Sequence, residues 1–279
     1  MPVEGCGGRR ACSLAFAKQA PSWTYFSTNR AETQPRRFRR LLLVAKKAKN
    51  EEQKRALVIV AHPDDAEFLC AATVAKLCSE GWEVNYLLTT SGDMGTHDES
   101  MTREALAPIR EKEQRAAAKV LGVKEVVFLR YPDGFFEDTA EARGRIVYEI
   151  RRLRPDTVIT WDPFRSSFTH RDHRLTGQAA LDAIFPLARN HLGYPEHLRD
   201  GLEIHRVKEV LLAGSSDPDY FVDVTEHFNK KIAALRKHTS QLRQAPLREL
   251  RKRLRERMKE AAKEQEFELA ESFRRLTWG

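Results

Sequence analysis

The side chains best suited to chemistry lie close together in residues 61–67, which read Ala-His-Pro-Asp-Asp-Ala-Glu. A short apolar run precedes them and a helical pattern follows, so His62, Asp64 and Asp65 stand where a strand ends and a helix begins. Ligands bind at that edge of an open α/β sheet. An imidazole beside two carboxylates predicts a partner there, and a divalent metal ion is the obvious one.

The spacing of these three residues divides them between two roles. His62 and Asp65 are three residues apart, which on the first turn of a helix places both side chains on one side. Asp64 points elsewhere, so its carboxylate can remain free of the metal. The alternative is that Asp64 and Asp65 only cap the helix, although a cap needs one carboxylate and no histidine.

A second group with the same composition occurs at residues 170–173, which read His-Arg-Asp-His. It follows a strand predicted over residues 157–161 and again opens a helix. Two such strand ends can face each other across one crevice, so His173 could complete a set with His62 and Asp65. Three protein ligands with an open fourth position are typical of a catalytic zinc site.

Two other members of this second group have alternative readings. His170 is either part of the site or an ordinary surface or core histidine. Asp172 either orients the neighbouring histidines, as carboxylates behind a metal site do, or caps the helix.

Strands and helices alternate along the middle of the chain. Apolar runs predict strands over residues 56–61, 83–90, 125–130, 157–161, 207–213 and 220–224. Helical periodicity predicts helices over residues 66–80, 102–120, 139–153, 173–185 and 225–239. We therefore expect the α/β class, with a Rossmann-like, mostly parallel sheet and helices on both faces. No glycine-rich phosphate loop is present, which argues against a nucleotide-binding version of this fold.

The flanking segments have different patterns. Residues 1–34 predict a disordered or flexible arm, and residues 35–55 predict a basic amphipathic helix. The α/β domain is expected over residues 56–240, and a charged C-terminal helix over residues 241–279. Residues 186–206 interrupt the alternation with proline and glycine, so they predict a functional or inserted loop.

The charge of the chain is unevenly distributed. The formal net charge of +8 divides into +9 for residues 1–55, −5 for residues 56–240 and +4 for residues 241–279. A nucleic-acid-binding domain carries its basic side chains on the folded body, so we expect no nucleic-acid partner. No apolar run is long enough to span a membrane. The four cysteines contain no C-x-x-C pair, which excludes a thiolate zinc site and indicates reduced thiols in a cytoplasmic protein.

The two motifs together resemble the LmbE-like or PIG-L family of zinc-dependent N-acetylglucosaminyl deacetylases. The resemblance covers about residues 56–240, and residues 1–55 and 244–279 lie outside it. It is strengthened by shorter segments that would each be weak alone: Thr89-Thr90-Ser91-Gly92-Asp93, Ile109-Arg110-Glu111-Lys112-Glu113, Tyr131-Pro132-Asp133-Gly134, Asp223-Val224-Thr225 and Lys237-His238-Thr239-Ser240-Gln241.

The resemblance implies a division of labour at the site. His62, Asp65 and His173 would bind Zn²⁺, with another divalent metal as the alternative. Asp64 would be the general base that takes a proton from a metal-bound water, the nucleophile. His170, if protonated, would stabilise the oxyanion, and either Asp64 or His170 would protonate the leaving amine.

The resemblance also implies residues that bind the sugar. Arg110 and Asp133 match family positions near the sugar, and Gly92, Asp93 and His238 are further candidates. Pairing of Arg110 with a glutamate of its own helix is the alternative for that residue. In one departure from the family, Phe168 stands where some members carry a tyrosine, which would place more of the oxyanion stabilisation on His170.

The sequence therefore predicts a zinc-dependent hydrolase that removes the N-acetyl group from an N-acetylglucosamine-type sugar or sugar conjugate. One alternative is a metal-dependent hydrolase of another amide or ester. Another is a non-catalytic metal-binding protein that interacts through its basic termini. The expected partners are the N-acetylated sugar and further copies of the chain in a homo-oligomer, and the expected location is the cytoplasm.

Overall fold

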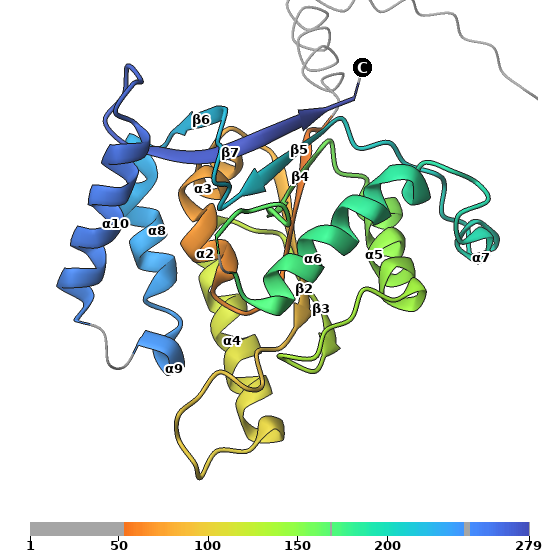
Figure 1. The fold of residues 1–279 in the computed structure, drawn as a ribbon, viewed down its shortest axis with the longest axis horizontal. Helices are drawn as coiled ribbons and strands as arrows, with labels where there is room; N and C mark the ends of the chain where they lie inside the picture. Colours follow the sequence, from red (N-terminus) through yellow and green to blue (C-terminus); the bar gives the residue numbers. More distant parts are fainter. Residues whose placement is uncertain (1–52, 168, 243–245, 279) are drawn as a thin grey trace, which may run out of the picture. The chain divides into compact units, whose positions relative to one another are not determined.

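Six predicted strands and one further strand form a single sheet with the order β3-β2-β1-β4-β5-β7-β6 (Figure 1). The parallel strands are β1 (Arg55–Val60), β2 (Glu83–Thr90), β3 (Glu125–Tyr131), β4 (Thr157–Trp161) and β5 (Glu209–Ala213). Strand β7 (Ala270–Thr277) runs antiparallel between β5 and β6 (Tyr220–Asp223). The computed structural model thus confirms the predicted α/β class with a mostly parallel sheet.

The structure describes residues 53–167, 169–242 and 246–278. They belong to one compact unit, Glu52–Gly279. The arm predicted over residues 1–34 and nearly all of the basic helix predicted over residues 35–55 lie outside the described residues, so both stay predictions. Phe168 also lies outside them.

Alternation of side chains along β1 explains why helices cover both faces of the sheet. Val58 and Val60 pack into one buried apolar cluster, whereas Leu57 and Ile59 pack into another. The first cluster is covered by α2 (Asp65–Leu69), α3 (Ala71–Ser79) and α4 (Arg103–Leu121). The second is covered by α5 (Ala140–Leu153) and α6 (Arg171–Asp182).

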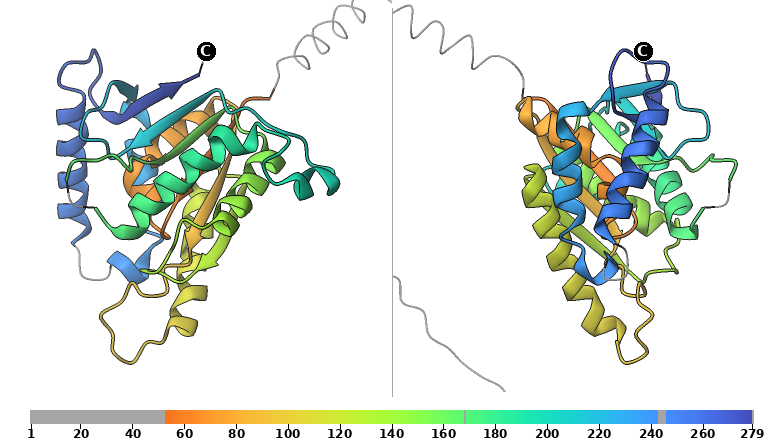
Figure 2. Two further views of the ribbon diagram at one scale, coloured as in Figure 1. Left: turned by 45° about the vertical axis from the view of Figure 1, so that its right-hand side comes forward. Right: turned by 90° about the vertical axis from the view of Figure 1, so that its left-hand side faces the viewer.

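The helices in the C-terminal part of the chain add to the first face. Helix α8 (Phe228–Leu235) packs there, and α10 (Leu247–Ala261) lies along α8 (Figure 2). Shorter helical segments are η1 (Ala183–Ala188), α7 (Pro195–Arg199), η2 (Thr225–His227) and α9 (Thr239–Leu242). No helix in the described part of the chain is long and apolar enough to cross a membrane.

The prediction of a helix over residues 241–279 is wrong for the last part of the chain. Helix α10 ends at Ala261, and residues 270–277 form strand β7 inside the sheet. Two adjacent arginines and a glutamate conceal the strand pattern of this segment. Glu271 is nevertheless buried, because it has partners on other elements that a local pattern does not reveal.

Those partners connect β7 to the helices that follow residues 61–67. The predicted helix over residues 66–80 breaks at Cys70, which offers α3 no side-chain cap. The carboxylate of Glu271 accepts hydrogen bonds from the N–H groups of Ala72 and Thr73 and so caps α3 from the sheet. Lys231 donates to that carboxylate at 2.6 Å and to the carbonyl of Phe68 at 2.8 Å, which satisfies the buried charge.

The segment predicted as a loop over residues 186–206 contains α7 and is held by one buried arginine. Arg151 of α5 donates hydrogen bonds to the carbonyls of Leu187, Ala188, Asn190, Gly193 and Tyr194. A guanidinium group carries five N–H donors in a rigid plane, so a single side chain can satisfy several carbonyls of one irregular segment. This segment is therefore an ordered part of the fold.

The order of the strands creates a crevice beside β1. After β1 the chain moves outward to β2 and β3, and it then returns to β4 on the other side of β1. The connections of β1 and β4 therefore diverge at their carboxyl ends, which is where open α/β sheets bind ligands. Residues 61–67 follow β1 and residues 170–173 open α6 after β4, so both motifs meet at this crevice.

Candidate metal centre and active site

Three predicted metal ligands come together at the crevice. Nδ1 of His62 lies 3.0 Å from Nε2 of His173 and 3.6 Å from Oδ2 of Asp65. Nε2 of His173 lies 3.1 Å from Oδ1 of Asp65. One side chain comes from the end of β1, one from the first residue of α2 and one from α6, so the fold assembles a set that is separated by more than a hundred residues in sequence.

This donor set fits a divalent cation. Two imidazole nitrogens at 3.0 Å repel one another through their lone pairs unless a proton or a cation lies between them. The neighbouring carboxylate oxygen of Asp65 adds negative charge. Two histidines and one carboxylate are also a ligand set of catalytic zinc sites.

Asp65 is held so that its Oδ1 faces His173. Its Oδ2 accepts the main-chain N–H groups of Ala61 at 3.0 Å and His62 at 2.9 Å, together with the indole N–H of Trp161 at 3.1 Å. Burial would raise the pKa of Asp65, but His173 and His62 outweigh it and keep the pKa well below its ordinary value. The carboxylate is therefore ionised, and Oδ1 is the oxygen available to a metal.

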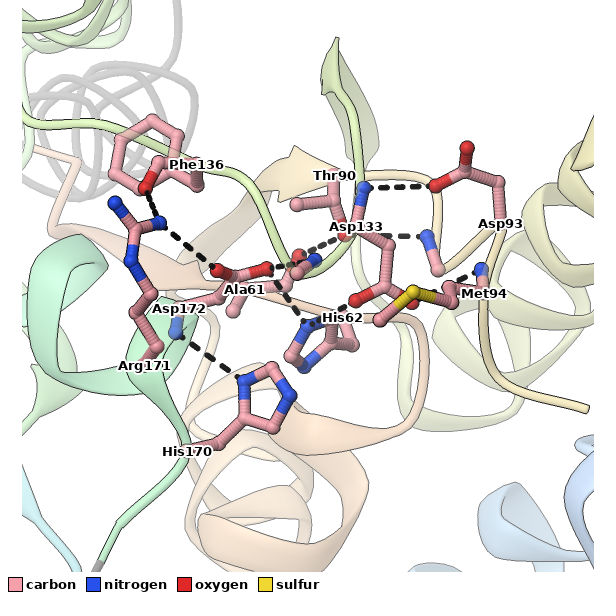
Figure 3. Close-up of polar contacts among 12 residues, drawn as sticks. Ala61, His62, Thr90, Asp93, Met94, Asp133, Phe136, His170, Arg171 and Asp172 are labelled. Carbon is pink, nitrogen blue, oxygen red and sulfur yellow. Dashed lines mark hydrogen bonds and ion pairs between the residues drawn. The ribbon is translucent and has the colours of Figure 1, made fainter.

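The other ring nitrogen of His62 is engaged by two carboxylates (Figure 3). Nε2 lies 3.0 Å from Oδ1 of Asp133 and 3.4 Å from Oδ2 of Asp172. Burial would lower the pKa of His62, but hydrogen bonds with Asp133, Asp172 and Asp65 raise it well above its ordinary value. When the ring is neutral, Nε2 carries the proton towards the two carboxylates and the lone pair on Nδ1 faces His173 and Asp65, which is the tautomer a metal ligand requires.

Two other groupings that include His62 are compact enough for one ion: His62 with His170 and His173, and His62 with Asp133 and Asp172. Asp133 already accepts the N–H of Met94 at 3.2 Å (Figure 3). Asp172 accepts the N–H of Gly134 at 2.7 Å. Both carboxylates share a single ring nitrogen of His62. The grouping with Asp133 and Asp172 is therefore better suited to orienting His62 than to binding the ion itself.

His170 lies at the mouth of the site. Its ring centroid is 4.8 Å from that of His62 and 5.2 Å from that of His173. Nδ1 accepts the N–H of Asp172, so Nε2 carries the proton in the neutral ring (Figure 3). Burial and the neighbouring histidines His62 and His173 lower the pKa of His170, which favours a neutral hydrogen-bond donor over a protonated ring.

Asp64 makes none of these contacts with the metal-ligand set. Its Oδ2 lies 3.4 Å from Nη2 of Arg110, which extends from α4. Burial outweighs the charge of Arg110 and raises the pKa of Asp64 to about 6. The predicted separation of Asp64 from His62 and Asp65 is thus present in the geometry.

Arg110 is buried against main-chain carbonyls. It donates to the carbonyl oxygens of Pro63 and Gly92. Gly92 has φ +65°, and a Cβ at this position would collide with the Arg110 guanidinium. The absence of a side chain at Gly92 therefore allows the Arg110 guanidinium to pack against the main chain there. In this position Arg110 also reaches the carboxylate of Asp64.

Among the residues predicted to bind the sugar, Asp93 lines an open cavity. The cavity has a volume of about 450 Å³, and its polar lining includes Asp93, Arg103, Glu111, Arg130 and Tyr131. Asp93 accepts a hydrogen bond from the N–H of Asp133 at 2.8 Å and pairs with Arg103 at 3.0 Å. Asp133, also predicted to contact the sugar, directs its carboxylate towards His62.

His238 is fully buried. Its Nε2 lies 3.1 Å from Oε2 of Glu67. The next two residues, Thr239 and Ser240, bind the carboxylate of Glu113 on α4. The segment that begins at Lys237 therefore packs behind the site and attaches to α4.

Trp161 is a site residue that the sequence reasoning missed. Its ring stacks on His173 with a centroid distance of 3.9 Å and an interplanar angle of 10°. The same side chain donates to Asp65, so it contacts two of the three metal-ligand candidates. Its place at the end of a strand predicted to reach the crevice is the signal that could have identified it.

Comparisons with known proteins agree with this geometry. A family model described as PIG-L, GlcNAc-PI de-N-acetylase, matches residues 57–184, which include all three metal-ligand candidates. The diacetylchitobiose deacetylase of Thermococcus kodakarensis is 35% identical over 192 residues, covering 67% of this chain and 70% of that protein. A probable N-acetyl-alpha-D-glucosaminyl L-malate deacetylase 2 of Bacillus anthracis is 30% identical over 196 residues, covering 68% and 83%.

The similarity extends to the three-dimensional arrangement. The N,N'-diacetylchitobiose deacetylase from Pyrococcus horikoshii, solved in complex with its inhibitor MPG, has 28% sequence identity and a TM-score of 0.76. The match covers 88% of this chain and 95% of that chain. It therefore reaches beyond residues 57–184.

Proposed function

The chain belongs to the PIG-L/LmbE family of deacetylases, and from this membership we propose that it hydrolyses the acetamide of an N-acetylglucosamine-type sugar or sugar conjugate. The named relatives are deacetylases of diacetylchitobiose and of an N-acetylglucosaminyl malate. The substrates in these names share an N-acetylated glucosamine unit and differ in the second group attached to it. We assign the same unit to this chain.

The observation that carries the proposal is the position of Asp64 beside the candidate metal centre. His62, Asp65 and His173 converge through their ligand atoms. Asp64 lies between two of them in sequence, yet its carboxylate pairs with Arg110. A purely metal-binding site has no need of this additional carboxylate, whereas a hydrolase needs one as a base.

His62, Asp65 and His173 would hold the metal ion, for which we propose Zn²⁺. When bound, the ion would lower the pKa of a water molecule and polarise the acetamide carbonyl. Asp133 and Asp172 keep His62 in the tautomer that leaves Nδ1 free. The remaining steps depend on side chains that stay outside the ligand set.

Asp64 is the proposed general base and general acid. A carboxyl group with a pKa near 6 can accept a proton from the attacking water and return it to the nitrogen of the leaving amine. The carbon–oxygen bond forms as the water loses this proton, and the carbon–nitrogen bond breaks as the amine gains it. The products are acetate and the free amino sugar.

His170 is the proposed donor to the oxygen of the acetamide. Because its Nδ1 accepts the N–H of Asp172, the N–H at Nε2 can donate without a net charge on the ring. A neutral imidazole that donates in this way agrees with the lowered pKa of His170. We propose it as the stabiliser of the negative charge that develops on that oxygen.

The sugar or its second group is proposed to enter the cavity beside Asp93. Planar polar side chains and a tyrosine line this cavity, and such side chains suit a ring with several hydroxyl groups. Asp93 and Arg103 face it from the loop after β2 and from α4. The other predicted contacts, Gly92, Arg110 and His238, are proposed to act through Asp64 and the loop instead.

The experiment combines metal analysis with an acetate-release screen over N-acetylglucosamine conjugates. The proposal expects bound metal, acetate release from at least one conjugate and loss of release on treatment with a chelator. Release from other amides or esters alone would favour a hydrolase of a different substrate. Bound metal without any turnover would favour a non-catalytic protein. Homo-oligomerisation and a cytoplasmic location stay predictions.

A further inference from the structure

The main chain of Asp64 has an unusual conformation. Its φ is 118° and its ψ is −23°, a combination that residues with a Cβ rarely adopt. Such a strained conformation persists only where surrounding contacts determine it. The contacts around Asp64 therefore indicate what holds it in place.

Two side chains on one face of α4 hold Asp64. Oε1 of Gln114 accepts the main-chain N–H of Asp64 at 3.0 Å. Arg110 pairs with the carboxylate of Asp64 and donates to the carbonyl of the preceding residue, Pro63. Residues 110 and 114 are four apart on α4, so their side chains are neighbours on the helix surface.

Gln114 is itself fixed by a buried carboxylate. Its Nε2 donates to both oxygens of Glu67, at 2.9 and 3.0 Å, so the amide oxygen must point the other way, towards Asp64. Nε2 of His238 lies 3.1 Å from the same carboxylate. All three side chains are fully buried. A continuous chain of hydrogen bonds thus runs from His238 through Glu67 and Gln114 to the backbone of Asp64.

The metal-ligand candidates do not depend on this chain. Asp65 is held by the N–H groups of Ala61 and His62 and by Trp161. His62 is held by Asp133 and Asp172. Loss of the hydrogen bond that Gln114 accepts from Asp64 would therefore remove one of the two side-chain supports of Asp64, while His62 and Asp65 keep their own supports.

We propose that Gln114 is a positioning residue for the reaction, and that it holds the strained backbone of Asp64 so that its carboxylate stays beside the metal site. Glu67 and His238 fix the orientation of the Gln114 amide. This inference rests on the proposed role of Asp64 as general base. It also gives His238 a function in the interior, in place of a contact with the sugar.

The first test replaces Gln114 with leucine, which is similar in size and makes no hydrogen bond. A displacement of a catalytic group by about 1 Å can cost about a hundredfold in rate, and loss of a buried supporting contact typically costs about 10- to 100-fold. We expect kcat for acetate release to fall within that range, while KM and the amount of bound metal stay at the wild-type level.

A pair of substitutions separates the hydrogen bond from general packing. Gln114→Glu alone sets a second carboxylate against Glu67, so kcat should fall. Adding Glu67→Gln restores complementarity: the new amide donates to the carboxylate at 114, and its oxygen can still accept from His238. We expect the double variant to recover most of the lost kcat. This comparison stands even if the leucine variant fails to fold.

Glu113→Gln is the matched control. Glu113 precedes Gln114 on α4, and its carboxylate accepts hydrogen bonds from Thr239 and Ser240. It makes no hydrogen bond to Asp64. The control should lower thermal stability without a matching fall in kcat.

Several results would overturn the inference. Wild-type kcat in Gln114→Leu would do so, as would parallel losses of kcat and bound metal, or a double variant no better than Gln114→Glu. If the wild-type protein releases acetate, any of these three variant results overturns the role of Gln114 and leaves the proposed function intact. A wild-type protein that binds metal and releases no acetate overturns the proposed function, and this inference with it.

Discussion

Replacing Trp161 with phenylalanine should weaken metal binding by about tenfold or more. Phenylalanine keeps an aromatic ring against His173, where the indole now stacks at 3.9 Å. It removes the N–H that reaches Oδ2 of Asp65 at 3.1 Å. The substitution therefore isolates one hydrogen bond to one metal-ligand candidate.

The magnitude follows from the partners that Asp65 retains. A hydrogen bond to a charged group contributes about 1.5–3 kcal/mol, and each 1.4 kcal/mol corresponds to a factor of about ten in affinity. Two main-chain N–H groups continue to hold the carboxylate of Asp65, so the lower end of that range applies. Trp161→Leu also removes the stack on His173 and should weaken binding further.

The assay is a competition for Zn²⁺ between the metal-free protein and a chelating indicator of known affinity. Trp82→Phe is the matched control, because Trp82 is a partly buried tryptophan that packs on the apolar cluster under α3 and α4. It should leave the affinity for Zn²⁺ unchanged. An unchanged affinity in Trp161→Phe would refute the assignment of Trp161 as a support of the metal centre.

Three further substitutions test contacts that position the site or stabilise the sheet. Glu271→Ala should lower the free energy of unfolding in urea by about 3–5 kcal/mol, because it leaves a buried lysine unpaired; a loss below about 1 kcal/mol would contradict this. Gly92→Ala should reduce acetate release because its Cβ would displace Arg110, and wild-type kinetics would argue against that displacement. Asp156→Asn should reduce the loss of stability in acid. Burial alone would raise the pKa of Asp156, but Lys208 and a main-chain N–H outweigh burial and lower that pKa. The ionised carboxylate therefore stabilises the fold above about pH 4, and this stabilisation is lost below it. An unchanged dependence of stability on acid pH in Asp156→Asn would contradict this role of Asp156.

The convergence of the three metal-ligand candidates could be predicted from the sequence because each candidate lies just after a strand. His62 and Asp65 follow an apolar run directly, and His173 opens the helix after another strand. The alternation of strands and helices then implies a parallel sheet whose carboxyl ends share one edge. Distance in sequence is therefore no obstacle to placing these three residues together.

The roles of the surrounding residues depend on contacts that no local pattern contains. Asp133 reads as a loop residue free to contact a sugar, yet the β3 loop brings its carboxylate to His62. His238 reads as a polar residue near a helix end, yet it is buried against Glu67. The position of each side chain, Asp133 and His238, depends on the charged group that the tertiary fold places opposite it.

Strand β7 was missed for a related reason. Its core-facing positions include Glu271, which local hydrophobicity assigns to the surface. Burial of this carboxylate is compensated by Lys231 from α8 and by the N–H groups at the start of α3. A strand that depends on a buried ion pair lacks the apolar alternation by which strands are recognised.

The most direct test of the account compares Asp64→Asn with Asp65→Asn by metal analysis and acetate release on the same preparations. We expect Asp64→Asn to keep the wild-type amount of metal and to lose about 10²–10⁴-fold in kcat, the usual contribution of general acid–base catalysis. Asp65→Asn should lose metal and activity together. Retained activity in Asp64→Asn, or loss of its metal, would contradict the division between a ligand and a base that underlies the proposed function.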